Sequence, residues 1–269
     1  MTNYNHKKEK MRTQKISFPD RQTLCVFPEE RSNLSEALSE LHLVEHYPVI
    51  VLIGGGIDED EADATQRAIH TIAKIAEDLK AAIVCGGTDM GVMAEIGQIR
   101  SQNHYRFPLV GVTLEKLATW PDGPQSTNVL WWGTKRWNLE EHYTHFILVP
   151  GDTFGDESPW IVDAATLLSA GRQSVTILIN GGEVSRKDIE LSLEKGRAVI
   201  ALSRTGRLAD EFARQPNRNQ LITVASANAE QRIVELVEAA LAVKDEITTP
   251  QFKMVTASSH RLTKRPEKL

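Results

Sequence analysis

The chain has 269 residues, 41% of them hydrophobic and 25% charged, the composition of a globular protein large enough for one α/β domain with flanking segments. No apolar run approaches the roughly 18 residues of a membrane span, and the N-terminus lacks the apolar core of a secretory signal, so we expect a cytoplasmic protein that does not enter a membrane. The net charge of −5 is uneven, because residues 1–15 and 251–269 each carry +4 and residues 16–250 carry −13. This acidic body disfavours binding of nucleic acid, which depends on neutralising phosphates.

The domain organisation is predicted to be simple. Residues 1–13 and 250–269 are expected to be flexible basic tails, either solvated or in contact with an acidic partner, and residues 14–249 to form a single domain. Cys25 and Cys85 are far apart and do not have the spacing of a metal site. We therefore expect two reduced thiols in the core, and no metal site.

The predicted elements begin with short strands at Lys15–Phe18 and Thr23–Phe27 and a helix at Leu34–Val44. Continuous apolar runs then predict strands at Val49–Ile53, Ala82–Cys85, Leu109–Thr113, Thr144–Val149, Val175–Ile179 and Ala198–Leu202. Helical spacing of apolar residues falls between and after them, at Ile69, Ile72, Ala73, Ala76 and Leu79 and at Ile233, Leu236, Val237, Ala240 and Leu241. This alternation predicts an α/β fold with a Rossmann-like, doubly wound, mostly parallel sheet and helices on both faces.

Ligands bind such sheets at the carboxyl ends of the strands, so the loops after the strands are the candidate sites. Three of these loops begin with glycines: Gly54-Gly55-Gly56, Gly86-Gly87 and Asn180-Gly181-Gly182. The bare backbone either leaves room and N–H groups for a flat or anionic ligand, or only permits tight turns.

The run from Gly86 to Met93 is the most informative of the three. Thr88 or Asp89 is expected to cap the helix that follows, and Asp89 alternatively accepts hydrogen bonds from ligand hydroxyls. A helix start opened by two glycines predicts a phosphate site. We therefore expect Gly87 to face the phosphate, so that a methyl group at this position would occupy ligand space.

A second phosphate site is predicted in the loop Ser203-Arg204-Thr205-Gly206-Arg207, because arginine binds phosphate through paired N–H donors. The alternative is that both arginines form surface ion pairs, with Asp210 or Glu211 for example. The acidic run at 58–63 is expected to cap the helix that reaches Leu79. Gly54–Gly56 would then contact the sugar or base, and the phosphates would bind where no acidic cluster competes.

Three carboxylates follow the fourth of the apolar strands, at Asp152, Asp156 and Glu157. They either perform acid/base chemistry, bind ribose hydroxyls or hold a divalent ion, or Asp156 and Glu157 are acids in the first turn of the helix that reaches Leu168. His145, at the start of a buried strand, is interpreted as structural.

Four tryptophans lie in one irregular segment: Trp120, Trp131, Trp132 and Trp137. We expect this segment to form a lid that stacks on a base, an oligomer contact or a satellite core.

Taken in order, the motifs VIVLIGGG, CGGTDMGVM, THFILVPGDTFGDES, ILINGG and TGRLAD resemble the SLOG superfamily, and within it the prokaryotic branch similar to the N-terminal cytoplasmic region of melastatin-type TRP channels. The resemblance covers residues 45–245 and implies a Rossmann-like fold that binds a nucleotide or nucleotide-derived ligand, with ADP-ribose or an NAD-related molecule as candidates. We expect sensing of this ligand without turnover and without a required cofactor. The ligand-binding residues implied by the resemblance are Gly54, Gly55, Gly56, Gly86, Gly87, Thr88, Asp89, Gly91, Gly155, Asp156, Glu157, Asn180, Gly181, Gly182, Gly206 and Arg207, and the last loop adds Ser203 and Thr205.

The same superfamily includes the Lonely Guy phosphoribohydrolases, which implies an alternative function as a nucleotide N-glycosidase with Asp156 or Glu157 as catalytic residue. Their motif Pro-Gly-Gly-x-Gly-Thr-x-x-Glu is only partly present, because Asp152 replaces the second glycine and Glu157 follows Gly155 by two residues instead of four. A further alternative is an interaction protein with a vestigial cleft, which uses the tryptophan segment and the basic tails. Homo-oligomerisation is compatible with each of these.

Overall fold

The computed structural model describes residues 11–44, 46–57, 59–124, 136–170, 173–215 and 219–242. A nine-stranded sheet has the order β1-β2-β8-β5-β4-β3-β9-β10-β11, and β6 and β7 form a separate two-stranded ribbon. In the large sheet only the β1–β2 hairpin is antiparallel, which confirms the predicted mostly parallel α/β architecture. The strands are β1 (Arg12–Phe18), β2 (Arg21–Phe27), β3 (Val49–Gly54), β4 (Ala82–Cys85), β5 (Leu109–Leu114), β6 (Ala118–Thr119), β7 (Trp137–Asn138), β8 (His145–Val149), β9 (Ser174–Ile179), β10 (Ala198–Ser203) and β11 (Ile222–Ser226).

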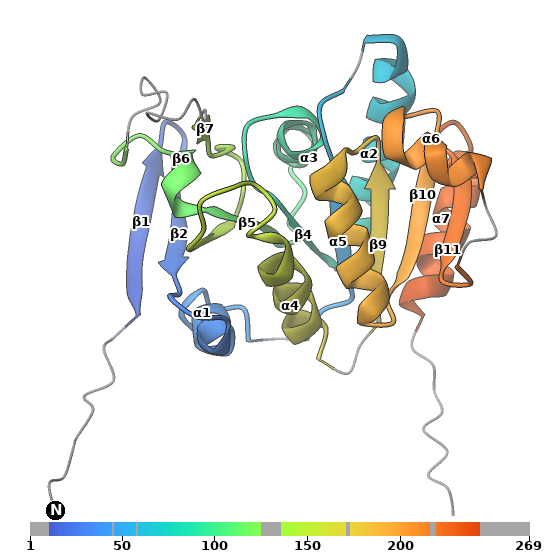
Figure 1. The fold of residues 1–269 in the computed structure, drawn as a ribbon. Coiled ribbons are helices and arrows are strands. Elements are labelled where there is room, and N and C mark those ends of the chain that lie inside the picture. The colour runs from blue at the N-terminus through green and yellow to red at the C-terminus, as the bar shows by residue number, and fades with distance from the viewer. Residues whose placement is uncertain are drawn as a thin grey trace, which may run out of the picture.

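Helices cover both faces of the sheet. They are α1 (Leu34–Glu40), α2 (Ala62–Asp78), α3 (Gly91–Gln102), α4 (Ser158–Ser169), α5 (Glu183–Glu194), α6 (Arg207–Arg214) and α7 (Glu230–Leu241). The helices α2, α3 and α7 share one hydrophobic core with one sheet face, and α1, α4, α5 and α6 share a second core with the other. Figure 1 is viewed from the side that carries α1, α4 and α5. Burial on both faces explains why the central strands are apolar throughout.

The chain reverses its direction of travel across the sheet between β3 and β9. From β3 it proceeds outward through β4 and β5 to β8, then returns and proceeds the other way through β9, β10 and β11. The helix after β3 and the helix after β9 pack on opposite faces, so a crevice opens at the carboxyl ends of these two neighbouring strands. Open α/β sheets bind ligands at such a switch point.

Most element bounds agree with the predicted ones, with differences at the two sheet edges. β1 begins at Arg12, which the sequence places in the flexible N-terminal segment, and α1 ends at Glu40 although the predicted helix extends to Val44. β11 is not predicted at all, because this edge strand is only partly buried and its sequence, ITVAS, has no long apolar run. The remaining boundaries of the tails fall outside the described residues and stay predictions.

The two cysteines and His145 are structural, as predicted. Cys25 and Cys85 are buried free thiols, and burial raises the pKa of Cys85 to about 12. The Cys85 thiol contacts the hydroxyl of Tyr143 at 2.9 Å. Burial also lowers the pKa of His145 to about 4, so its ring is neutral near pH 7, and Nδ1 lies 2.8 Å from Thr144 Oγ1.

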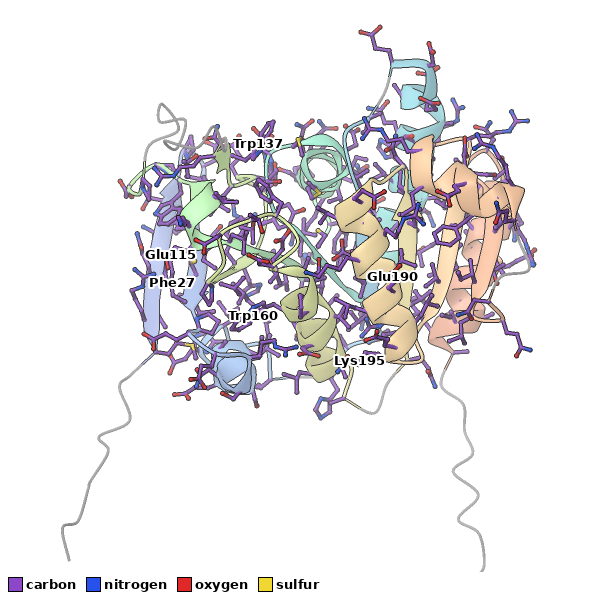
Figure 2. The ribbon with its side chains drawn as sticks, viewed as in Figure 1. Phe27, Glu115, Trp137, Trp160, Glu190 and Lys195 are labelled. Carbon is purple, nitrogen blue, oxygen red and sulfur yellow. The ribbon has the colours of Figure 1, made fainter. Side chains whose placement is uncertain are left out.

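The described tryptophans of the irregular segment favour the satellite core. Trp120 is 8% exposed, and its ring packs against Phe27 with the ring centroids 6.2 Å apart. Trp137, labelled in Figure 2, lies in β7 and is half-buried, whereas residues 131 and 132 are outside the described residues. The Arg12 guanidinium lies over the Phe27 ring and pairs with Glu115, and Figure 2 shows both partners beside β1 and β2.

Candidate ligand-binding site

Three of the predicted loops meet at the switch point. The start of α3 packs on the loop after β3, since Val92 N donates to Gly55 O at 3.2 Å. A Cβ built on Gly91 would lie only 2.1 Å from that same oxygen, and the φ of Gly91 is +52°, so only glycine fits there. A Cβ on Gly55 would lie 3.8 Å from atoms of Asn180 and Gly181, and one on Gly56 would meet nothing within 4 Å. The loop after β3 therefore borders open space on one side and α3 on the other.

Gly87 does not face the crevice, which corrects the sequence-based expectation. Its φ is +76°, and a Cβ there would lie 2.7 Å from Gly111 Cα and 3.1 Å from Phe146 Cε1. These atoms belong to β5 and β8, so an added methyl group would enter the sheet and not the ligand space. Gly86 is less constrained, because its Cβ would meet only Met93 side-chain atoms, at 3.8 Å.

Thr88 and Asp89 do not cap α3, contrary to the prediction. The N-cap residue is Met90, without a side-chain cap. Thr88 instead bridges to Leu139, and Asp89 N donates to Asn138 O. Asp89 is exposed and lines a separate cavity of about 440 Å³, together with Phe18, Pro19, Gln98, Thr119, Trp120, Pro121, Asn138, Leu139, Glu140, Glu141 and His142. At the predicted phosphate site at the start of α3, the N–H groups of residues 92–94 are already used, because they donate to the carbonyls of Gly55 and Met90.

The loop after β10 is bound tightly to the loop after β9. Asn180 N donates to Thr205 Oγ1 at 2.8 Å, and Thr205 Oγ1 donates to Leu202 O. The N–H groups at residues 208 and 209, in the first turn of α6, donate to the carbonyls of Gly181 and Asn180. The first turn of α6 therefore has few free donors for an anion.

The side chains of the loop after β10 differ in their accessibility. The Ser203 hydroxyl donates to Ala225 O in the neighbouring strand, so it serves the sheet. Arg207 is exposed at the start of α6, with a φ of +43°. Of the acids suggested as partners of the arginines, Asp210 accepts from Arg204 N, and Glu211 pairs with Arg186 at 2.6 Å. The exposed side chains of this loop are those of Arg204 and Arg207.

The acidic run approaches the site, which sequence reasoning missed. As predicted, α2 begins within it, at Ala62, and Asp63 lies in the first turn. However, Glu61 occupies the N-cap position without a side-chain cap, and its Oε1 lies 3.5 Å from the position of a Cβ on Gly206. The expectation that no acidic group competes near residues 203–207 is therefore wrong. No sequence signal marks this contact, which joins distant loops.

The two candidate catalytic carboxylates have different surroundings. Asp156 Oδ2 accepts from Asp152 N and Thr153 N, at 3.0 and 3.1 Å, and these bonds lower the pKa of Asp156. Glu157 is 7% exposed, its Oε2 accepts from Gly155 N at 2.8 Å, and burial raises the pKa of Glu157. Glu157 occupies the N-cap position of α4 but forms no side-chain cap, and no acid lies in the first turn, which begins at residue 158. The alternative that both are first-turn acids is therefore wrong.

A third carboxylate, Asp188 on α5, belongs to the same cluster and was not predicted. It is 5% exposed, and burial and the neighbouring Glu157 raise the pKa of Asp188 to about 7. Beside it, Lys187 Nζ donates to Gly155 O at 2.7 Å. The available signal was helical spacing, because Ser185, Asp188 and Ile189 lie on the buried face of α5. Within the described residues, no three His, Cys, Asp or Glu side chains are placed to hold a metal ion.

The start of α5, at this edge of the sheet, has a run of N–H donors without acceptors in the described part of the chain. The N–H groups of Glu183, Val184 and Ser185 have no acceptor among the described residues. Gly182 precedes them, and a Cβ there would meet nothing within 4 Å. A helix start with free N–H groups and open space attracts anions.

No helix in the described part of the chain is both long and apolar enough to cross a bilayer.

Several solved structures align with this chain at low sequence identity. The solved structure of TM1055 aligns with a TM-score of 0.51 at 14% identity, covering 71% of this chain and 99% of that chain, which shows a shared fold. The molybdenum cofactor binding protein from the phototrophic bacterium Rippkaea orientalis aligns with a TM-score of 0.49 at 17% identity, covering 73% and 99% of the two chains. The molybdenum cofactor carrier protein MCP from Chlamydomonas reinhardtii aligns with a TM-score of 0.46 at 17% identity, covering 72% of this chain and 99% of that chain. No curated protein matches the sequence.

The family model described as "SLOG in TRPM, prokaryote" matches residues 47–244, which include every predicted ligand-binding residue. This match supports a ligand-binding role. Because it spans most of the sequence, the chain belongs to the prokaryotic SLOG-in-TRPM family, as its motifs predict.

Proposed function

We propose that the chain binds a nucleotide-derived ligand, ADP-ribose or an NAD-related molecule, in the crevice above β3 and β9, without turnover. The observation that carries this proposal is the meeting of the glycine loops at Gly55–Gly56 and Gly181–Gly182 beside the unused donors of α5. This combination offers room for a flat group and N–H donors for an anion at the position where doubly wound sheets bind ligands.

The phosphate of this ligand belongs at the start of α5. The N–H groups of residues 183–185 find no acceptor within the part of the chain that the structure describes. An anion at a helix start gains about 0.3–1 kcal/mol from the helix dipole, and up to about 2 kcal/mol in partly buried geometries. We assign Arg207 to the same phosphate, because it starts α6 next to Leu208, whose N–H donates to Gly181 O, and because its side chain is exposed. Gly54, Gly91, Thr205 and Gly206 support the surrounding loops.

Thermal unfolding in the presence of NAD, ADP-ribose or AMP tests the proposal. A ligand at about 100 times its Kd stabilises the folded state by about 2.7 kcal/mol, which raises the melting temperature of a domain this size by roughly 5–10 °C. Chromatography of the same samples reports release of free base. We expect stabilisation by at least one ligand and no release. No stabilisation by any of the three would refute the proposal.

A second candidate function is N-glycosidic cleavage of a nucleotide. The observation that favours it is the buried pair Glu157 and Asp188, because a carboxyl group with a raised pKa retains a proton that it can donate to a leaving group. Against this function, Asp152 replaces the second glycine of the phosphoribohydrolase motif. Release of base by the parent protein, abolished in Glu157→Gln, would establish this function in place of simple binding.

A further inference from the structure

The side chain of Asn180 is buried at the end of β9 with part of its hydrogen-bonding capacity unused. Only 1% of the residue is exposed, and its φ is +56°. Its Oδ1 accepts from Gly181 N at 2.6 Å, whereas its Nδ2 has no acceptor among the described residues. A buried donor without an acceptor is costly, so a partner supplied from outside the chain would be favoured.

The carboxylate of Glu61 approaches the same corner, beside Gly206. A Cβ built on Gly206 would lie 3.0 Å from Asn180 Nδ2 and 3.5 Å from Glu61 Oε1. Glu61 comes from the connection between β3 and α2, whose start stands above the sheet edge near α6 (Figure 1). An acceptor that follows β3 and a donor that follows β9 therefore converge at the switch point.

Between Glu61 and Asn180, the available groups favour a hydroxyl group over a phosphate. The N–H groups of Leu208 and Ala209 already donate to the carbonyls of Gly181 and Asn180, so these helix amides are not available to an anion. Glu61 adds a negative charge, which repels one. A hydroxyl group matches the corner because it donates its hydrogen to a carboxylate and accepts from an amide at the same time.

We propose that Glu61 and Asn180 bind the ribose hydroxyls of the ligand and thereby favour ribonucleotides over deoxyribonucleotides. This inference rests on the proposed function and assigns one part of the ligand within the same site. The two hydroxyl groups of a ribose donate to the Glu61 carboxylate, and Asn180 Nδ2 donates to one hydroxyl oxygen. The phosphate then binds at the start of α5, which follows Asn180 by only two glycines.

The test is calorimetric titration of the full chain with AMP, 2′-deoxyAMP and 3′-deoxyAMP. A hydrogen bond to a charged group changes affinity by about tenfold or more, so the parent should bind AMP at least that much more tightly than one of the deoxy forms. Glu61→Gln should bind AMP about tenfold more weakly and lose most of this discrimination. Asn180→Asp keeps the oxygen bonded to Gly181 but removes the donor and adds a second charge, so it should weaken AMP at least as much while remaining folded.

The matched control is Glu59→Gln, which removes the same charge from the exposed turn two residues earlier. It should leave affinity and discrimination within about twofold, because exposed charges interact weakly. If the parent binds AMP and both deoxy forms with equal affinity, the inference is overturned but the proposed function stands. The same conclusion follows if Glu61→Gln still discriminates AMP from the deoxy forms. If the parent binds ADP-ribose or NAD but not AMP, unchanged affinity for that ligand in Glu61→Gln overturns the inference. A parent that binds none of the three would overturn both proposals.

Discussion

The substitution Gly87→Ala should destabilise the protein without removing its ligand affinity. An alanine with a φ near +76° costs about 1 kcal/mol relative to glycine. Its Cβ would also lie 2.7 Å from Gly111 Cα and 3.1 Å from the Phe146 ring, and forcing such an overlap in a packed interior costs about 1–3 kcal/mol. The expected loss is therefore about 2–4 kcal/mol, or roughly 4–16 °C in melting temperature. A domain of ordinary stability stays folded after this loss.

Gly86→Ala is the matched control, because its added Cβ would meet only Met93 side-chain atoms at an ordinary 3.8 Å. We expect a change within about 0.5 kcal/mol there. Calorimetry of both variants, with and without ADP-ribose, distinguishes a group that packs into the sheet from one that contacts ligand. If Gly87→Ala has the same melting temperature as Gly86→Ala but is no longer stabilised by ADP-ribose, the orientation derived for Gly87 is wrong.

Three further substitutions test other parts of the site. Gly91→Ala places a methyl group against the Gly55 carbonyl at 2.1 Å, so urea unfolding should show a loss of about 2–4 kcal/mol, and a stable variant would contradict that packing. Arg207→Ala should weaken ADP-ribose binding by about 1.5–3 kcal/mol if its guanidinium meets a phosphate, and unchanged affinity would remove that role. Asp188→Asn should flatten the pH dependence of stability. The folded parent keeps a proton up to about pH 7 that the unfolded chain releases near pH 3.8, so the parent loses stability as pH rises through this window. The variant should avoid up to about 4 kcal/mol of that loss, and parallel stability curves for the two proteins would contradict the assignment.

The central strands could be predicted from the sequence because burial on both sheet faces makes them apolar along their whole length. Val49–Ile53 shows this clearly, since every one of its residues is buried. The edge strand β11 was not predicted, because its first three residues are only partly buried and it has no continuous apolar run. The motifs VIVLIGGG and ILINGG also indicated loops at the crevice, because they run through the ends of the neighbouring strands β3 and β9.

The roles of individual groups within these loops could not be predicted, because they depend on which distant segment lies opposite. The amides of a helix start look alike in sequence, yet most of those of α3 and α6 donate to backbone carbonyls, whereas those of α5 find no acceptor among the described residues. Likewise, the sequence predicts that Glu61 caps α2, whereas in the structure its carboxylate lies beside Gly206. The direction in which Gly87 presents a Cβ follows from its positive φ, which a Gly-Gly pair does not reveal.

The β1–β2 hairpin has a consequence for how the chain reaches this fold during synthesis. It lies before the residues matched by the family model, yet β2 completes the sheet by pairing with β8, and Thr23 donates to Tyr143 across 120 residues of sequence. A lone hairpin is only marginally stable in water, so these first strands must leave the ribosome and wait until the β8 segment has been translated. In the interval β2 exposes an unpaired edge that other nascent chains can join. A chain started at residue 47 would transfer the same hazard to β8, whose edge would then stay uncovered even in the finished domain.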